Sequence, residues 1–523
     1  MKYIGKSINR VDGIKKATGD LKYVDDLKLS GMLHAQVKRS PYPHAKILNI
    51  DTSKAENLPG VKAVITGKDF PKRVGLYLAD KTFLAVDKVR FKGEAVASVA
   101  AETEEIAKRA VELIEVEYEE LPVVSNVVDA MKPDSPLVHP DLGEYKHAPI
   151  FKNIPGTNIS EHFKLRKGNV EKAFESADYV FETEFYVPQI QHCSIETHSA
   201  IAKYDRDGSL TVWASCQSPY AVRLALSDAF NIPLNKLRVI SPAVGGGFGA
   251  KAGTTLEGIV IPLAMENVGR PVKLTYARED EFLYAYVRQG MLSRFKNGVM
   301  KDGKIAAIKN EFIWDGGAYT EYGVNIAKSA GFAAVGAYDV PNIWCDSYCV
   351  YTNNPAGGPY RGFGMSEIQF GIEQNMDTIA KKLNISPVEI RRINAQKPGG
   401  RTATNAIVDD SCGLLDCIEQ VAKDIEIDVE PEQPKEKHKV RAKGFACGMK
   451  APSMPNNVAS SAVVRLNEDG TVYLQVSAQD LGQGSDTALT QICAEALDIP
   501  PEKITINTGD TANNPYEWQT VAS

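Results

Sequence analysis

Clustered metal ligands are missing from this sequence of 523 residues. Its eight cysteines are scattered without a C-x-x-C pair, and its eight histidines form no H-E-x-x-H motif. Iron–sulfur clusters and protein-ligated zinc depend on such groupings of thiolates or imidazoles. The sequence therefore gives no support to a metal centre held by its own side chains, and redox chemistry would need a centre carried elsewhere.

Long apolar runs and a strong net charge are also absent. No stretch approaches the apolar length that spans a bilayer, and the segment Met1–Lys6 starts no apolar signal sequence. The formal net charge of −6 gives no electrostatic case for nucleic acid or an anionic membrane as partner. We therefore expect a cytoplasmic protein.

The length of the chain predicts several domains. The first part alternates strands and helices around a core of its own, with Thr103 as the N-cap of a helix over residues 104–113. A proline-rich connector without apolar periodicity follows, and we expect it to cross the surface. The predicted parts are, in order, residues 1–124, a linker 125–160, residues 161–425, a linker 426–443, and residues 444–523.

An internal repeat organises the second half of the chain. Residues 207–217 match residues 469–479, and in each copy a helix, an Ile-Pro step and a strand come next. The unit predicts strand, loop, helix and strand, present twice around the second linker. Gln217 and the segment 479–484 then lie at equivalent strand ends, where α/β proteins place ligands. The second copy reaches its strand without further elements and reads as an incomplete domain.

The segment 244–251, Val-Gly-Gly-Gly-Phe-Gly-Ala-Lys, is the most unusual stretch of the sequence. Four glycines in five positions predict a loop that approaches a ligand closely, between a strand over 237–240 and a helix over 254–265. The loop formally satisfies the dinucleotide fingerprint G-x-G-x-x-A, although Glu279 or Asp280 would serve only loosely as its acidic partner. A nucleotide-binding dehydrogenase thus remains one alternative.

Two further segments carry polar groups among glycines. Arg361 is flanked by glycines and by two aromatic residues, a setting that suits a guanidinium fixed in a cleft to orient a planar or anionic substrate. The segment 479–484 offers amide donors and acceptors to a polar cofactor edge. His192 and His198, on either side of Glu196, are interpreted as structural residues.

Taken together, these motifs resemble the molybdopterin-binding large subunit of the xanthine oxidase and aldehyde oxidoreductase family. The resemblance extends over the whole chain, from Ile-Gly-Lys-Ser at residues 4–7 and Arg-Ser-Pro-Tyr-Pro-His-Ala at 39–45 to the three glycine-rich motifs at 245–249, 360–364 and 482–484. It implies an N-terminal α/β domain of the hammerhead type, followed by molybdopterin-binding α+β domains, of which the last is incomplete.

The resemblance also implies roles for individual residues. Gln217 matches the glutamine that hydrogen-bonds an oxygen ligand of the metal, and Arg361 matches the arginine that orients substrate. No protein side chain ligates the metal, because the dithiolene of the pterin holds it. The implied cofactor-binding residues are Gln217, Gly247, Phe248, Gly249, Arg361, Gly482, Gln483 and Gly484.

The family's chemistry implies cofactors and partners for this chain. The cofactor is a molybdopterin, with its cytosine dinucleotide form left open, and the reaction oxidises a carbon of an N-heterocycle or aldehyde with oxygen derived from water. The electrons then leave for iron–sulfur clusters and FAD. Since the sequence carries neither cysteine motifs nor a flavin signature, we expect an iron–sulfur small subunit and an FAD-binding medium subunit as partners.

Two departures from the family pattern affect the expected activity. No residue corresponds to the glutamate general base, so the chain is either truncated or completed by a second polypeptide. Ala252 stands where purine-oxidising members carry a glutamate, and Thr404 stands near the place of their stacking aromatic, which disfavours xanthine as substrate. A catalytically incomplete cofactor-binding partner subunit is the second alternative.

Overall fold

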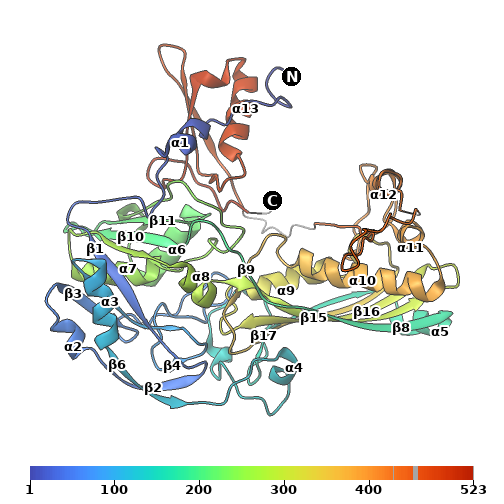
Figure 1. Ribbon diagram of the computed structural model, residues 1–523, viewed down its shortest axis with the longest axis horizontal. Helices are drawn as coiled ribbons and strands as arrows, with labels where there is room; N and C mark the ends of the chain where they lie inside the picture. Colours follow the sequence, from blue (N-terminus) through green and yellow to red (C-terminus); the bar gives the residue numbers. More distant parts are fainter. Residues whose placement is uncertain (428, 451–457, 522–523) are drawn as a thin grey trace.

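The computed structural model describes residues 1–427, 429–450 and 458–521. N-terminal and central elements (blue to green) form a body beside a long curved sheet, and the C-terminal unit (red) stands above them next to the N-terminus (Figure 1). Helices and five sheets are interspersed along the described part of the chain. The predicted α+β class is confirmed.

A mixed sheet of seven strands forms the body, in the order β12-β11-β10-β13-β1-β5-β3. Its core consists of alternate residues on one face, closed by α6 (Pro219–Phe230) and α7 (Glu257–Glu266). The strands are β1 (Leu33–Arg39), β3 (Val61–Thr66), β5 (Ala95–Ala101), β10 (Ser199–Tyr204), β11 (Leu210–Ala214), β12 (Leu237–Ile240) and β13 (Val272–Thr275).

The first part of the chain shares this sheet with the glycine-loop region, because β1 pairs in parallel with β13. The sequence predicted a separate core for this first part. One apolar cluster, under α3 (Glu104–Leu113), is separate from the core of the seven-stranded sheet. The N-cap prediction for α3 is confirmed, since the Thr103 hydroxyl accepts the Ile106 N–H. The remaining elements of this part are α1 (Gly13–Thr18), α2 (Ser53–Glu56), β2 (Ala45–Asp51), β4 (Lys88–Val89) and β6 (Glu115–Glu120), with β4-β2-β6 as a small sheet.

The curved sheet of Figure 1 has five strands in the order β7-β17-β16-β15-β8. Helices α9 (Gly323–Phe332) and α10 (Met365–Leu383) pack on it around the fully buried Trp314. Its strands are β7 (Ile159–Lys167), β8 (Tyr179–Val187), β15 (Gly290–Val299), β16 (Ile305–Gly317) and β17 (Asn342–Tyr351), and the accompanying helices are α5 (Val170–Ser176), α11 (Pro387–Asn394) and α12 (Leu414–Asp424).

The connector over residues 125–160 does not simply cross the surface. It contains α4 (Val127–Ala130) and the short η1 (Leu142–Glu144), and buries Val138, Leu142 and Phe151 against the curved sheet. Its prolines prevent regular periodicity, which is why its apolar residues give no recognisable pattern in the sequence.

The internal repeat is present in three dimensions. In the second copy, β19 (Ala462–Leu466) pairs with β20 (Val472–Val476), α13 (Ser485–Leu497) follows, and η3 (Pro501–Lys503) leads into β21 (Ile504–Asn507) parallel to β20. The first copy runs β10, β11, α6, η2 (Leu234–Lys236) and β12 with the same pairing. Both helices end on a left-handed residue, Asn231 or Asp498.

No helix in the described ranges is long and apolar enough to cross a bilayer.

Candidate functional site

A small sheet of two-residue strands joins the segments that carry the predicted site. β14 (Val287–Arg288) pairs with β9 (Ile190–Gln191) on one side and with β18 (Gly357–Gly358) on the other. The sheet therefore brings the histidine segment that follows β9 next to the Arg361 segment that follows β18. Such short strands have no periodicity of their own, so sequence patterns do not reveal this junction.

Gln217 and the glycine loop after β12 hold each other in place. The Gln217 carboxamide oxygen accepts the Gly249 N–H at 2.8 Å, and the Gln217 N–H donates to the Lys251 carbonyl at 2.9 Å. A Cβ on Gly247 would lie 2.5 Å from the same carboxamide oxygen. Glycine is required at position 247 because the side chain of Gln217 fills the space beside it.

The two Phe-Gly motifs share left-handed φ angles, and their loops touch each other. Phe248 and Phe363 both have φ of 53°, and each is followed by a glycine with positive φ. A Cβ on Gly249 would lie 2.3 Å from the Pro359 carbonyl oxygen, so the loops meet backbone to backbone. Left-handed bulky residues are strained, and such strain is typical of ligand sites. The Phe248 side chain is 45% exposed and stands at this junction as a wall.

A buried ion pair lies directly behind the glycine loop. The Lys251 ammonium is 2.7 Å from a carboxylate oxygen of Glu196, which also accepts the Gly245 N–H at 2.7 Å and the Ser215 hydroxyl at 3.0 Å. The Lys251 side chain is 1% exposed. Burial lowers the pKa of Lys251, and the adjacent Glu196 carboxylate opposes that shift. The pair fixes both ends of the loop, at residues 245 and 251.

The two histidines have hydrogen-bond partners within the chain. The His198 ring lies 2.7 Å from the Glu281 carboxylate and contacts the Ala250 carbonyl at 3.2 Å through its other nitrogen. The His192 ring is 2.6 Å from the Pro359 carbonyl and stacks on Tyr360. Each imidazole therefore supports one of the two Phe-Gly loops. No group of three or more potential metal-ligating side chains occurs within residues 1–427, 429–450 and 458–521.

His192 makes the stability of the site dependent on pH. Burial lowers its pKa to about 4, although the bond to Pro359 opposes the shift. In the unfolded chain the pKa of His192 is near 6.5, so the imidazole binds a proton in a pH range where it stays neutral in the folded chain. The contribution of His192 to the free energy of unfolding is complete above pH ~6.5 and is lost as the pH falls toward about 4. We expect a loss of roughly 2 kcal/mol between pH 7.5 and pH 5 from this residue.

The variant His192→Gln keeps a side-chain donor and removes the titration. Urea unfolding of both proteins at pH 7.5 and pH 5 should show a smaller pH-dependent loss for the variant. An identical loss in the two proteins would contradict the assignment.

Arg361 is exposed, and its neighbour Arg288 holds the backbone beneath it. The Arg288 guanidinium is 3.0 Å from the buried Glu367 carboxylate, 4.0 Å from the Tyr360 ring centre and 3.3 Å from the Arg361 carbonyl. Within the described ranges the Arg361 side chain makes no hydrogen bond or ion pair. The backbone at Arg361 is fixed, while its guanidinium is available to a ligand.

The C-terminal unit reaches this site through residues 519–520. The Thr520 carbonyl accepts a long bond from the Gln217 amide, 3.4 Å, and the Thr520 hydroxyl accepts the Gln479 N–H at 2.8 Å. Gln519 donates to the Tyr322 hydroxyl at 3.2 Å. The equivalent glutamines of the two repeat copies, Gln217 and Gln479, are thus joined by one threonine.

The loop over residues 482–484 is held by Gln483 and by Arg10. Gln483 accepts the Leu481 N–H at 2.6 Å and donates to the Gln479 carbonyl at 3.0 Å, and Arg10 donates to the Gly482 carbonyl at 3.0 Å. The exposed Gly482 has φ of 111°, and a Cβ there would meet nothing within 4 Å. This loop therefore presents open backbone, in contrast to the closely packed glycines 245, 247 and 249.

The structure disagrees with one sequence expectation about the glycine loop. Helix α7 begins at Glu257, separated from Ala250 by an irregular segment, so the loop does not open directly into a helix. Dinucleotide fingerprints place the pyrophosphate at a helix N-terminus. The candidate acidic partners, Glu279 and Asp280, lie in the first turn of α8 (Arg278–Tyr284). The dinucleotide alternative is not favoured.

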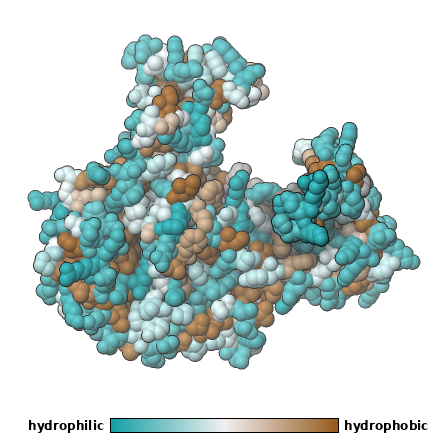
Figure 2. All heavy atoms as spheres, viewed as in Figure 1, coloured by the Kyte–Doolittle hydropathy of each residue, from teal (hydrophilic) through white to brown (hydrophobic). Residues whose placement is uncertain are grey.

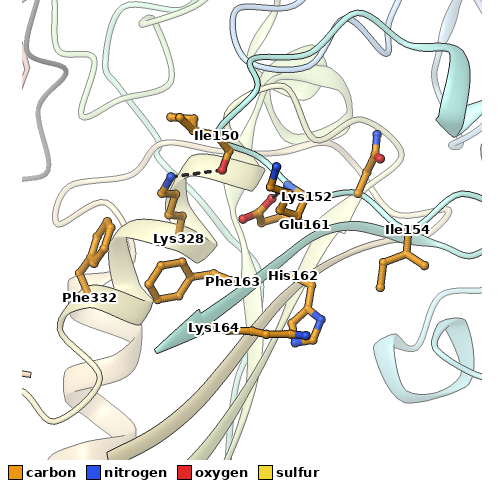
Figure 3. A pocket seen from close by; sticks show the side chains of 10 residues that line it. Ile150, Lys152, Ile154, Glu161, His162, Phe163, Lys164, Lys328 and Phe332 are labelled. Atoms are coloured by element: carbon orange, nitrogen blue, oxygen red, sulfur yellow. Dashed lines mark hydrogen bonds between the residues drawn. The ribbon is translucent and has the colours of Figure 1, made fainter. Parts of the chain in front are cut away.

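A cavity of about 550 Å³ lies elsewhere, between β7, α9 and residues 150–154. Figure 3 shows Lys328 donating to the Ile150 carbonyl and Glu161 close to Lys152. Burial raises the pKa of Glu161 to about 7. None of the predicted site residues lines this cavity.

Three parts of the site were not predicted from the sequence, namely the pairs Glu196–Lys251 and Arg288–Glu367 and residues 519–520. One feature of the sequence could have indicated the Glu196–Lys251 pair, because both residues are charged and stand in segments expected to be buried. Lys251 ends the glycine loop, and Glu196 lies between two histidines. Charged residues in such positions are usually paired.

Comparisons with known proteins agree with this arrangement. Models of the molybdopterin cofactor-binding domain match residues 150–395 and 418–523, and the model of the aldehyde oxidase and xanthine dehydrogenase a/b hammerhead domain matches residues 18–122. The nicotinate dehydrogenase large molybdopterin subunit of Eubacterium barkeri is 35% identical over 80% of this chain and 95% of its own length. The xanthine dehydrogenase molybdenum-binding subunit of Escherichia coli O157:H7 is 32% identical over 98% of this chain and 69% of its own length.

Among solved structures, aldehyde oxidoreductase from Desulfovibrio gigas superimposes with a TM-score of 0.85 at 28% identity, over 99% of this chain and 57% of that protein. Fold and sequence together define a molybdopterin-dependent oxidoreductase. The chain belongs to the xanthine dehydrogenase and aldehyde oxidoreductase family of molybdopterin-binding subunits. The resemblance inferred from its motifs is confirmed.

Proposed function

We propose that this chain binds a molybdopterin cofactor where the two repeat copies meet, and that it hydroxylates a carbon of an N-heterocycle or aldehyde. The observation that carries the proposal is the link between Gln217 and Gln479 through Thr520, beside the exposed Phe248 wall. The proposed cofactor-contacting residues are Gln217, Gly247, Phe248, Gly249, Arg361, Gly482, Gln483 and Gly484.

The residues present suit such a group. The Gln479 carboxamide oxygen is buried without a hydrogen-bond partner among the described residues, and the backbone at Gly482 borders open space. Amide groups, open backbone and an unpaired guanidinium are donors suited to a polar, phosphorylated pterin. When bound, the molybdenum of the cofactor would supply the oxidation chemistry that these side chains lack.

In this proposal the chain's own residues position the reactants. Gln217 holds the Gly249 N–H, which keeps Phe248 in its strained conformation as one wall of the site. Arg361 orients the substrate and stabilises negative charge on it. Ala252 is buried, and its N–H donates to the Gly249 carbonyl. Because its side chain is a methyl group, this position offers no carboxylate to a purine. A nicotinate-type heterocycle or an aldehyde suits it better.

We further propose that the general base of the reaction is none of the three carboxylates beside the two loops, and that another segment supplies it. Three carboxylates near the loops are each committed to a buried cation or imidazole. Glu196 pairs with Lys251, Glu281 with His198, and Glu367 with Arg288. A general base needs a free lone pair within reach of the substrate. A glutamate brought by another polypeptide segment would complete the site.

The proposed assembly includes an iron–sulfur small subunit and an FAD-binding medium subunit, which receive the electrons. The relatives named above are themselves called molybdopterin or molybdenum-binding subunits, which supports a division of labour among chains. The cytosine dinucleotide form of the pterin is part of the proposal.

Metal and cofactor analysis of the assembled enzyme tests the proposal. We expect about one molybdenum and one pterin per chain, released together on acid denaturation, and oxidation of nicotinate-type heterocycles or aldehydes. Gln217→Ala should lower the molybdenum content, whereas Gln433→Ala, in the charged linker, should leave it unchanged. Tight NAD(P) binding without molybdenum would refute the proposal.

A further inference from the structure

A cavity forms where the connector separates from the edge of β7. At Lys152 the two segments are still paired, and the Lys152 carbonyl accepts the His162 N–H at 2.9 Å. At Ile150 the connector has turned toward α9, where the Lys328 ammonium donates to the Ile150 carbonyl at 3.3 Å. The cavity of about 550 Å³ lies between the diverging segments (Figure 3). The turn toward α9 therefore leaves part of the β7 edge uncovered.

The uncovered part of this edge offers a backbone donor. β7 is the first strand of its sheet, and its register with β17 is continuous over residues 161–167. Because the His162 N–H points toward the connector, the N–H groups of Lys164 and Arg166 point to the same side. Among the described residues the Lys164 N–H has no hydrogen-bond acceptor. Four successive residues, 161–164, line the cavity, so it runs along the edge and receives this donor.

One wall of the cavity is aromatic. The Phe163 and Phe332 rings meet edge to face with their centres 4.8 Å apart. A Cβ on Gly331 would lie 2.2 Å from the Phe163 ring, so this ring is held closely against α9. Ile150 and Ile154 add apolar surface from the connector, and Ile150 is 59% exposed. Aromatic pairs of this kind present both a face and an edge to a further ring.

Two ammonium groups give the cavity a surplus of positive charge. The side chains of Lys328 and Lys152 donate to backbone carbonyls and make no ion pair in the described part of the chain. Burial lowers the pKa of Lys328, and Glu161 opposes that shift. Glu161 itself is 1% exposed, and burial raises its pKa to about 7. Positive charge therefore exceeds negative charge here at neutral pH.

We propose that this cavity binds a small aromatic carboxylate. The carboxylate accepts hydrogen bonds from the Lys164 N–H and from the Lys328 ammonium, and Lys152 adds a second positive charge. The ring of the ligand packs on Phe163 and Phe332. The volume is within the range of roughly 300–1,000 Å³ that is usual for small-molecule sites. The residues proposed to contact the pterin lie elsewhere, so this is a second site.

Other ligands fit the cavity less well. An inorganic anion would satisfy the ammonium groups but leave the two phenylalanine rings uncovered. An added peptide strand would need a longer free edge, because Lys167 holds residues 340 and 402 at the end of β7. On the face of the molecule in Figure 2, hydrophobic residues are interspersed with hydrophilic ones, whereas protein-docking surfaces gather them in one patch.

Calorimetric titration of the 523-residue chain with 2-naphthoate tests the inference. We expect saturable binding, and the neutral 2-naphthamide should bind at least about 10-fold more weakly because it lacks the charge. Lys328→Met keeps most of the side-chain volume and should weaken naphthoate binding about 10-fold. Lys54→Met, at an exposed ion pair, should leave the affinity unchanged. Equal affinities of naphthoate and naphthamide, or of Lys328→Met and the unaltered chain, would overturn the inference.

The variant Arg361→Ala separates this cavity from the site of the proposed function, which would also accept aromatic carboxylates. It should bind 2-naphthoate in the cavity as the unaltered chain does, with or without molybdenum. Loss of binding in Arg361→Ala but not in Lys328→Met would show that the ligand occupies the other site and would refute the inference. A chain that lacks molybdenum and still binds naphthoate in the cavity would contradict only the proposed function.

Protonation of Glu161 should control the affinity. Glu161 is faced by Lys152 and His147 of the connector, Lys328 of α9 and Cys349 of β17. Above its pKa of about 7 the ionised carboxylate repels the ligand, so naphthoate should bind about 10-fold more weakly at pH 8.5 than at pH 6. Glu161→Gln, which keeps an acceptor for the Lys152 N–H, should remove most of this difference, whereas His147→Gln should retain it. An undiminished pH dependence in Glu161→Gln would contradict binding in this cavity.

Discussion

Replacing Lys251 by methionine is expected to lower the free energy of unfolding by about 3–5 kcal/mol. The substitution keeps most of the side-chain volume and removes the ammonium that neutralises Glu196. The carboxylate, in a side chain only 10% exposed, would keep two donors, the Gly245 N–H and the Ser215 hydroxyl, but no cation. An unpaired buried charge is costly because little solvent remains to stabilise it. Urea unfolding at pH 7.5 measures the loss.

A matched control is available on the surface. Lys54 pairs with Glu115, and both side chains are at least 60% exposed. Lys54→Met should therefore change stability by no more than about 1 kcal/mol. The double variant Glu196→Gln with Lys251→Met removes the uncompensated charge and should recover part of the loss. Equal effects of Lys251→Met and Lys54→Met would show that the buried pair does not stabilise the loop.

The repeat and the regular elements of this fold could be predicted because their signals are local. The Asp-Gly turns at 207–208 and 469–470, followed by alternating apolar residues, mark the hairpins directly, and Thr103 marks the start of α3. These features depend on neighbouring residues only, so the structure reproduces them within a residue or two.

The junction of the site could not be predicted in the same way. β9, β14 and β18 are two residues long and come from segments about 70 to 170 positions apart, so no periodicity links them. The glycine motifs indicated that something approaches the loops closely, but not what. In the structure the nearest groups are Gln217, Glu196 and the Pro359 carbonyl. Such contacts depend on tertiary packing, which the sequence pattern does not contain.

Arg361→Ala is expected to lower turnover by about 100- to 1000-fold while the molybdenum content stays normal. The exposed guanidinium makes no ion pair within the described part of the chain, and its removal leaves no buried charge unpaired. The backbone beneath it stays fixed by Arg288. The residue should therefore act on the substrate and not on the fold. Steady-state kinetics, metal analysis and the melting temperature of the same preparation separate these effects.

The conservative variant Arg361→Lys distinguishes orientation from charge. Lysine keeps a positive charge but lacks the planar fork of donors, so a substrate held by two parallel hydrogen bonds should still react slowly, whereas one held by charge alone should recover. Loss of molybdenum in Arg361→Ala would instead show that the contact of Arg361 with the cofactor is needed to retain the metal. Arg288→Ala would unpair the buried Glu367 and should lower stability as well as turnover. Arg361 is exposed on a rigid backbone, whereas the neighbouring Arg288 is partly buried and paired with Glu367. The two arginines thus separate positioning of the substrate from support of the loop.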